Sequence, residues 1–261
     1  MDTINLKNAI IDALMEVRIE KTKVGYTFRT RGSCRFKDDI TKALDPRSMK
    51  HRNDFGLTMS SSKLLRQALK PLLSNFSTHL SLMRINSAIW KSVLSDKINE
   101  KGKRNAFHGY NSTLKNLELN PLASLHTLLY VTYKNKIDRE KGLFSLTLPS
   151  FNPMENIKNL KGATHFRIVS AAVELDFLKL DFTSNFLESE YLPFEHFQTE
   201  IISHEHQLKE NSIHPLILVL GLQYFQKVNG VYYQLLEKAR NGIFIINVDQ
   251  VSNEIKMSIK K

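Results

Sequence analysis

The sequence predicts an α+β protein in which a basic N-terminal β-hairpin and a helical hairpin precede an antiparallel β-sandwich. Three observations predict this class. Apolar residues alternate with polar ones on both sides of Gly25, recur at helical spacing from Leu64 to Val93, and alternate again after about residue 113. We therefore expect a basic module with two main helices over residues 1–112 and an all-β module over residues 113–261.

The N-terminal hairpin is centred on a glycine turn. Val17 and Ile19 alternate with charged residues before Gly25, and Tyr26 and Phe28 alternate with polar residues after it. Glycine supplies the positive φ that a tight turn requires. A competing interpretation makes the segment from about residue 5 to 20 an amphipathic helix, but we expect a helix over about residues 4–13 and the hairpin after it.

Two helices are predicted between the hairpin and the β module. Asp45 is the expected N-cap of the first helix, and Pro46 follows it at the first helical position. Pro71 should break the apolar stripe that follows, near Lys70, because proline cannot continue the helical hydrogen bonds. A second helix is expected after Ser77, ending near Gly102. Its stripe and that of the first helix can pack together as an antiparallel pair.

The β module is predicted from alternation and turns. Phe144, Leu146 and Leu148 alternate with polar residues, and the run 129–133 alternates before a polar turn over residues 135–142. The parity of the apolar residues changes within residues 166–177. This change predicts a bulge or strand break near residues 171–173.

Two Asn-Gly pairs and one apolar run complete this module. Asn229-Gly230 and Asn241-Gly242 both lie beside apolar runs, a pattern typical of hairpins with type I′ turns. Residues 215–222 lack polar alternation and predict a central strand covered on both faces. The whole module should hold roughly seven to nine strands, arranged as a sandwich.

The basic residues are concentrated in the first half of the chain. The chain has 37 Lys and Arg against 26 Asp and Glu, a net charge of +11. Residues 1–115 hold 22 basic and 10 acidic residues, whereas residues 116–261 hold 15 and 16. Clustered cations bind polyanions because they displace the counterions condensed on phosphates. The asymmetry favours a nucleic acid as partner of the first half, although many basic domains bind none.

Composition and chain ends indicate a cytoplasmic protein. The N-terminus lacks the basic and apolar regions of a signal peptide, and no apolar run approaches the roughly twenty residues that span a bilayer. Cys34 is the single cysteine, so an internal disulfide is excluded. We expect no membrane partner, no cofactor and no small-molecule substrate.

The most metal-like feature is His204-Glu205-His206. Residues two apart on a strand share a face, so both imidazoles could reach one ion, with His196 or Glu200 as the third ligand. The favoured alternative is a partly exposed polar patch. His165 is interpreted in the same way, as a hydrogen-bonded or solvent-facing strand histidine.

Enzyme motifs are absent from the sequence. No glycine-rich phosphate loop, no Gly-x-Ser-x-Gly elbow and no His-Glu-x-x-His helix occurs. The serines at 60–62 are interpreted as helix-capping residues, and Cys34 as an inert thiol. These absences favour a non-enzymatic binding protein.

The basic residues of the first module are the best candidate site. They suit the backbone phosphates of nucleic acid, and the aromatic residues Tyr26, Phe28, Phe36 and Phe107 lie among them. The alternative places these aromatics in the core and the charges on a solvated face. A second hypothesis for function is a structural protein that self-associates or scaffolds a complex through its β module. The candidate nucleic-acid-binding residues are Arg29, Arg31, Arg35, Lys37, Arg47, Lys50, Arg52, Lys101, Lys103 and Arg104.

Five short blocks spread over most of the chain are distinctive: KVGYTFRTRG (23–32), RNDFG (52–56), SKLLR (62–66), GATHFRIV (162–169) and QKVNG (226–230). Together they resemble blocks of an uncharacterised family of hypothetical proteins from Bacteroidota. The chain departs from that family at residues 12–15, where the family has a glycine pair. The resemblance implies no activity, cofactor or site residue.

Overall fold

The computed structural model describes residues 17–22, 25–30, 45–74, 79–236 and 240–251. The chain divides into two compact units, residues 1–49 and residues 50–261. The first unit contains strands β1 (Val17–Thr22) and β2 (Gly25–Thr30), which pair antiparallel with Val17 opposite Thr30. The helix expected over residues 4–13 lies outside the described residues.

Helices α3 and α5 begin close to where the sequence predicts. Helix α3 (Pro46–Ala68) starts at the proline that follows Asp45, and α4 (Lys70–Leu73) carries Pro71 in its first turn. The predicted break near Lys70 is therefore confirmed. Helix α5 (His79–Leu94) ends well before Gly102, because residues 95–110 form a loop held by side-chain hydrogen bonds.

The second unit is built on a seven-stranded antiparallel sheet. Its strand order is β3-β12-β10-β6-β7, with β11 paired to β10 and β8 paired to β6. Residues 216–222 of the predicted run 215–222 lie in β10, at the centre of the sheet and buried, as predicted. The members are β3 (Leu117–Glu118), β6 (His165–Asp176), β7 (Asp181–Glu188), β8 (Leu192–Pro193), β10 (Leu216–Val228), β11 (Val231–Gln234) and β12 (Gly242–Asp249).

A smaller antiparallel sheet contains β4 (Lys134–Asp138), β5 (Leu143–Leu148) and β9 (Ile202–Gln207), in the order β4-β5-β9. Short helices connect the strands: η1 (Asn111–Leu114), α6 (Leu125–Leu128) and α7 (Pro153–Asn156). The predicted α+β class with antiparallel sheets is thereby confirmed.

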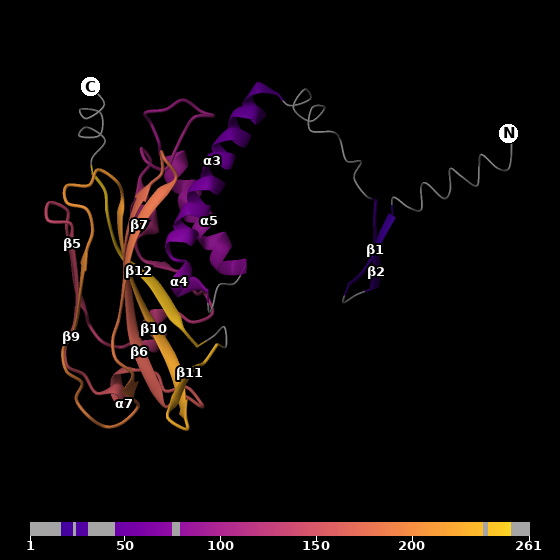
Figure 1. Ribbon diagram of the computed structural model, residues 1–261. Helices are drawn as coiled ribbons and strands as arrows, with labels where there is room; N and C mark the ends of the chain where they lie inside the picture. Colours follow the sequence, from indigo (N-terminus) through magenta and orange to yellow (C-terminus); the bar gives the residue numbers. More distant parts are fainter. Residues whose placement is uncertain (1–16, 23–24, 31–44, 75–78, 237–239, 252–261) are drawn as a thin grey trace. The chain divides into compact units, whose positions relative to one another are not determined.

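The large sheet is the middle of three layers (Figure 1). One face packs on the helices, in a core that joins Leu65 and Ile89 of the helices to Val169, Val173 and Ile217 of the strands. The helices add a layer that the predicted two-sheet sandwich lacks. The opposite face packs on the small sheet in a second core, which is made of Phe144, Leu146, Leu148, Phe166, Ile168, Leu218, Leu220 and Phe244.

The helices and sheets belong to one compact unit. Residues 50–261 form that unit, and the helical stripe shares a continuous core with β6, β10 and β12. This division differs from the boundary predicted after residue 112. The reason is that each helix buries its apolar stripe against the sheet as well as against the other helix.

Strand β6 is continuous where a break is predicted. It pairs with β10 and β7 without a register shift across residues 171–173, so that prediction is wrong. Residues 168–175 of β6 are all buried, on both faces of the strand, so a change in the parity of its apolar residues does not indicate a bulge or break. The register shift in this sheet lies instead between Leu218 and Val219, where β10 pairs with β12.

The strand predicted before the polar turn needs correction. Residues 129–133 contain one isolated bridge, from Leu129 to Ile157. The strand begins only at Lys134 and continues to Asp138, within the predicted turn. Strand β4 lies at the edge of the small sheet, where half-exposed positions accept lysine and asparagine.

Only one of the two Asn-Gly pairs forms a hairpin turn. Asn229 and Gly230 have φ angles of 50° and 82° and join β10 to β11, as predicted. Asn241 and Gly242 have no positive φ. Instead the Asn241 side chain accepts a hydrogen bond from Tyr224 N and donates one to Leu235 O, so this buried asparagine tethers neighbouring strands.

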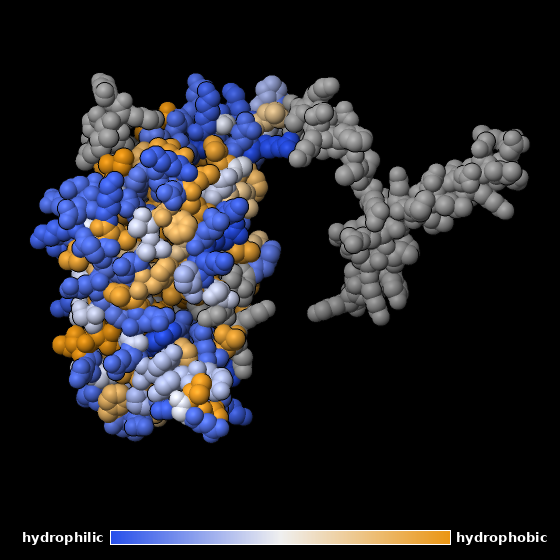
Figure 2. Space-filling model, viewed as in Figure 1, coloured by the Kyte–Doolittle hydropathy of each residue, from blue (hydrophilic) through white to orange (hydrophobic). Residues whose placement is uncertain are grey.

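No helix among the described residues has the length and apolarity to cross a membrane. The surface in Figure 2 shows hydrophobic residues in small groups interrupted by hydrophilic ones.

Candidate functional site

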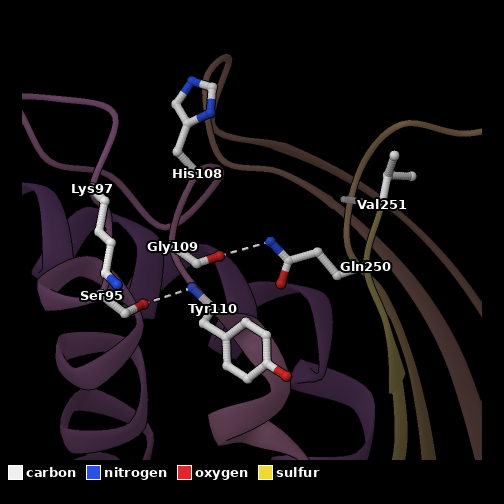
Figure 3. A pocket seen from close by; sticks show the side chains of 7 residues that line it. All are labelled: Ser95, Lys97, His108, Gly109, Tyr110, Gln250 and Val251. Atoms are coloured by element: carbon white, nitrogen blue, oxygen red, sulfur yellow. Dashed lines mark hydrogen bonds between the residues drawn. The ribbon is translucent and has the colours of Figure 1, made fainter. Parts of the chain in front are cut away.

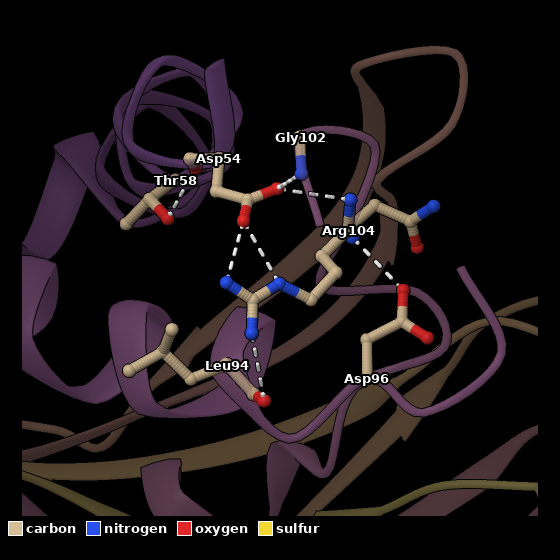
Figure 4. Close-up of polar contacts among 7 residues, drawn as sticks. Asp54, Thr58, Leu94, Asp96, Gly102 and Arg104 are labelled. Atoms are coloured by element: carbon tan, nitrogen blue, oxygen red, sulfur yellow. Dashed lines mark hydrogen bonds and ion pairs between the residues drawn. The ribbon is translucent and has the colours of Figure 1, made fainter. Parts of the chain in front are cut away.

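A buried carboxylate joins α3 to the loop that follows α5. Asp54 is fully buried on α3 and accepts hydrogen bonds from the backbone N–H groups of Gly102 (2.9 Å) and Arg104 (3.1 Å). It also accepts two from the Arg104 guanidinium, at 2.8 Å from Nε and 2.6 Å from Nη2 (Figure 4). Four donors on one carboxylate compensate the cost of burying its charge.

A second aspartate shapes the same loop from within. Asp96 accepts hydrogen bonds from the backbone N–H groups of Ile98, Asn99 and Asn105 and from the Asn99 side chain. Burial by itself would raise the pKa of Asp96, but these hydrogen bonds outweigh burial and lower it. The carboxylates of Asp54 and Asp96 therefore fix the shape of the loop, because its backbone N–H groups donate hydrogen bonds to them.

The fixed loop brings lysines from two segments together. Gly102 has a φ of 96°, and a Cβ at this position would lie 3.2 Å from the Cα of Lys50 on α3. Lys101 and Lys103 flank this glycine, and all three lysines are exposed. We call Lys50, Lys101 and Lys103 the lysine cluster. Among the described residues none of the three takes part in an ion pair.

The other candidate cations are distributed differently. Arg104 points inward to Asp54, so it belongs to the scaffold of the loop. Arg47 and Arg52 are exposed on α3, and Arg29 lies on β2 of the first unit, opposite Arg18. Arg31, Arg35 and Lys37 lie outside the described residues.

A cavity of about 640 Å³ lies beside the loop (Figure 3). Its lining includes Lys97 and Tyr110, and Tyr110 is 66% exposed. Gln250 braces one wall, because its Nε2 donates to Gly109 O at 2.6 Å. At the other wall, Ser95 Oγ accepts a hydrogen bond from Tyr110 N at 2.7 Å and so fixes the position of the Tyr110 backbone. The cavity is thus lined by an exposed aromatic ring and by an exposed lysine, residue types that suit a nucleobase and its phosphate.

Lys97 and Tyr110 were not among the residues predicted from the sequence. Both flank the basic run 101–104, so a wider window around that run would have included them. Phe107, which was predicted as a possible stacking residue, is buried in the helical core instead.

The two histidines of β9 are buried, so the interpretation as a partly exposed patch is wrong. Both rings point into the core between the sheets, where Ser170 Oγ lies 2.6 Å from His204 Nδ1 and 2.8 Å from His206 Nε2. His206 Nδ1 lies 3.0 Å from Asn185 Oδ1. Burial lowers the pKa of His206 to about 4, helped by the nearby His204, and burial also lowers the pKa of His204.

The geometry does not support the metal site considered from the sequence. In the described part of the chain, no group of three or more His, Cys, Asp or Glu residues is arranged to hold a metal ion. His165 is half-buried on β6, beside Thr164 Oγ1 at 3.0 Å and against the Tyr232 ring, as expected of a hydrogen-bonded strand histidine.

Comparison with known proteins gives no family: neither a protein-family model nor a curated protein matches the chain. The resemblance to a Bacteroidota family stays a prediction.

Proposed function

We propose that the protein is a non-enzymatic nucleic-acid-binding protein that contacts backbone phosphates through the lysine cluster. The observation that carries the proposal is the packing of Gly102 on Lys50, which joins cations from α3 and from the loop after α5. The ammonium groups are exposed and free of carboxylate partners among the described residues, so phosphates would not have to compete with existing ion pairs.

The scaffold under the lysines supports the same proposal. A fixed loop loses little conformational entropy when it binds, so each phosphate contact contributes more to affinity. Asp54 and Asp96 fix the loop through buried hydrogen bonds. The Tyr110 ring supplies an exposed face for a base, which favours single-stranded nucleic acid over a duplex.

A mobility-shift titration with single-stranded and duplex oligonucleotides at low salt tests the proposal. Reversing the charge of Lys50, Lys101 and Lys103 to glutamate should abolish the shift. The control reverses Lys134, Lys158 and Lys161, three exposed lysines of the neutral half, and should bind as the unchanged protein does. No shift by the unchanged protein, or equal binding by both variants, would reject the proposal.

Self-association is a second candidate, because strand β11 carries apolar side chains at an edge. Val231 and Tyr233 lie on one side of this strand and are exposed, with exposed Val228 opposite Val231. An edge strand with apolar side chains favours pairing with another chain. Light scattering of the unchanged protein and of a Val231→Lys, Tyr233→Lys variant tests this: a monomer at all concentrations would exclude self-association.

A further inference from the structure

A second cavity of about 640 Å³ lies between the end of β7 and the start of β9. Among the described residues, three carboxylates line it, from Glu188, Glu190 and Glu200, and no lysine or arginine does. Arg167 neutralises Glu188 through an ion pair at 2.6 Å. Glu190 and Glu200 are exposed and have no ion pair with any described residue, so the cavity is acidic on a basic protein.

One wall of this cavity is His204, which is only 6% exposed. Its Nδ1 atom lies 2.6 Å from Ser170 Oγ in the core, so Nε2 is the ring nitrogen that is left for another partner. In the described part of the chain Nε2 has no hydrogen-bond partner, although it is not sealed from solvent. The cavity therefore contains a buried side chain with one unused polar atom.

The hydrogen-bond chain behind His204 determines which atom carries the proton. Asn185 Oδ1 only accepts, so His206 donates to it from Nδ1. His206 Nε2 then accepts the single hydroxyl proton of Ser170, and Ser170 Oγ accepts from His204 Nδ1–H. This assignment leaves His204 Nε2 with a lone pair, able to accept a hydrogen bond from a ligand.

We propose that this cavity binds an organic ammonium or guanidinium group. One N–H of the ligand donates to His204 Nε2, and the carboxylates of Glu190 and Glu200 balance the positive charge. Leu192, Phe197 and Ile202 supply apolar surface for a short alkyl chain. An anion would be repelled by the carboxylates, and the volume is in the range of small-molecule sites. This inference is independent of the nucleic-acid proposal, because it uses different residues.

Calorimetric titration of nucleic-acid-free protein with 1,4-diaminobutane and with agmatine tests the inference. A Glu190→Gln, Glu200→Gln variant should bind about tenfold more weakly or worse, because two charge-assisted contacts are lost. The control is Glu140→Gln, Glu210→Gln, which makes the same charge change at exposed positions outside the cavity and should bind normally.

The ¹⁵N signal of His204 Nε2 gives a readout that a general charge effect would not move. It should shift when the amine binds, whereas that of His206 should not. The third probe is a short peptide that contains one arginine. If this peptide binds and the two small amines do not, the guanidinium group that the cavity recognises belongs to a protein segment. No binding of any of the three probes, or equal binding by both double variants, would overturn the inference.

Discussion

At the scale of single residues, Asp54 is the strongest constraint on the candidate interface. Its carboxylate accepts two backbone and two guanidinium hydrogen bonds from residues about fifty positions away along the chain. No local pattern in the sequence separates Arg104, which is bound by this carboxylate, from Lys101 and Lys103, which are exposed. Only the distant partner distinguishes a structural cation from one available to a ligand.

Asp54→Ala should lower the free energy of unfolding by about 3–5 kcal/mol, because it leaves the Arg104 charge without its buried partner. Urea denaturation measures the change. Lys136→Ala is the control, since Lys136 is 75% exposed and lies 3.8 Å from its partner Asp138, and such pairs contribute about 0–1 kcal/mol. Equal losses in the two variants would contradict the role given to Asp54.

The buried histidines predict a pH dependence of stability. The folded-state pKa of His206 is about 4, below its ordinary value of 6.5, so between these pH values the unfolded chain binds more protons than the folded one. The free energy of unfolding should therefore fall as pH decreases from about 6.5 to about 4, and no further below that from this group.

Urea denaturation of the unchanged protein and of His206→Gln across this pH range measures the effect. The variant should be less stable at pH 7, and its stability should depend less on pH. An unchanged slope in the variant would show that other groups cause the loss in acid.

At the scale of elements, the sequence predicts helix ends and turns correctly where local backbone chemistry alone determines them. The Asp45-Pro46 start of α3, the break at Pro71 and the Asn229-Gly230 turn all follow from local backbone chemistry. Asn241-Gly242 has the same dipeptide but a different role, because tertiary hydrogen bonds of the asparagine side chain replace the turn. The parity change in β6 has no structural meaning because both faces of that strand are buried.

The Gly102 turn should be more sensitive to substitution than the Gly230 turn. Both residues have positive φ, at 96° and 82°, but only at Gly102 would a Cβ meet neighbouring atoms, those of Lys50. Gly102→Ala should lower the free energy of unfolding by more than the roughly 1 kcal/mol expected from Gly230→Ala. Thermal and urea denaturation measure both; a smaller loss for Gly102→Ala would refute the close packing of the loop on α3.

At the scale of the whole molecule, the helices and sheets depend on one another. The sequence predicts both sets of elements but places a boundary after residue 112, because the change from helical to alternating periodicity occurs there. Periodicity reports the local structure of a segment and says nothing of which surface covers it. The observed core includes residues from both sides of that boundary.

A fragment of residues 113–261 should therefore fail to fold. Without α3 and α5, the helix-facing residues of the large sheet, including Val169, Val173, Ile217 and Ile243, would be exposed to water as an apolar patch. The control fragment, residues 45–261, keeps both helices and should remain monodisperse. Gel filtration and circular dichroism compare the two; a folded, monomeric 113–261 fragment would restore the boundary predicted from the sequence.

The most direct test of the proposed function is the salt dependence of binding to a single-stranded oligonucleotide, measured by fluorescence anisotropy. Replacing Lys50, Lys101 and Lys103 by glutamine should weaken binding and reduce the slope of log K against log salt by about 2, since each phosphate contact contributes about 0.7. Glutamine at Lys134, Lys158 and Lys161 should leave the slope unchanged. A slope that is the same in both variants as in the unchanged protein would contradict a phosphate-binding role for the lysine cluster.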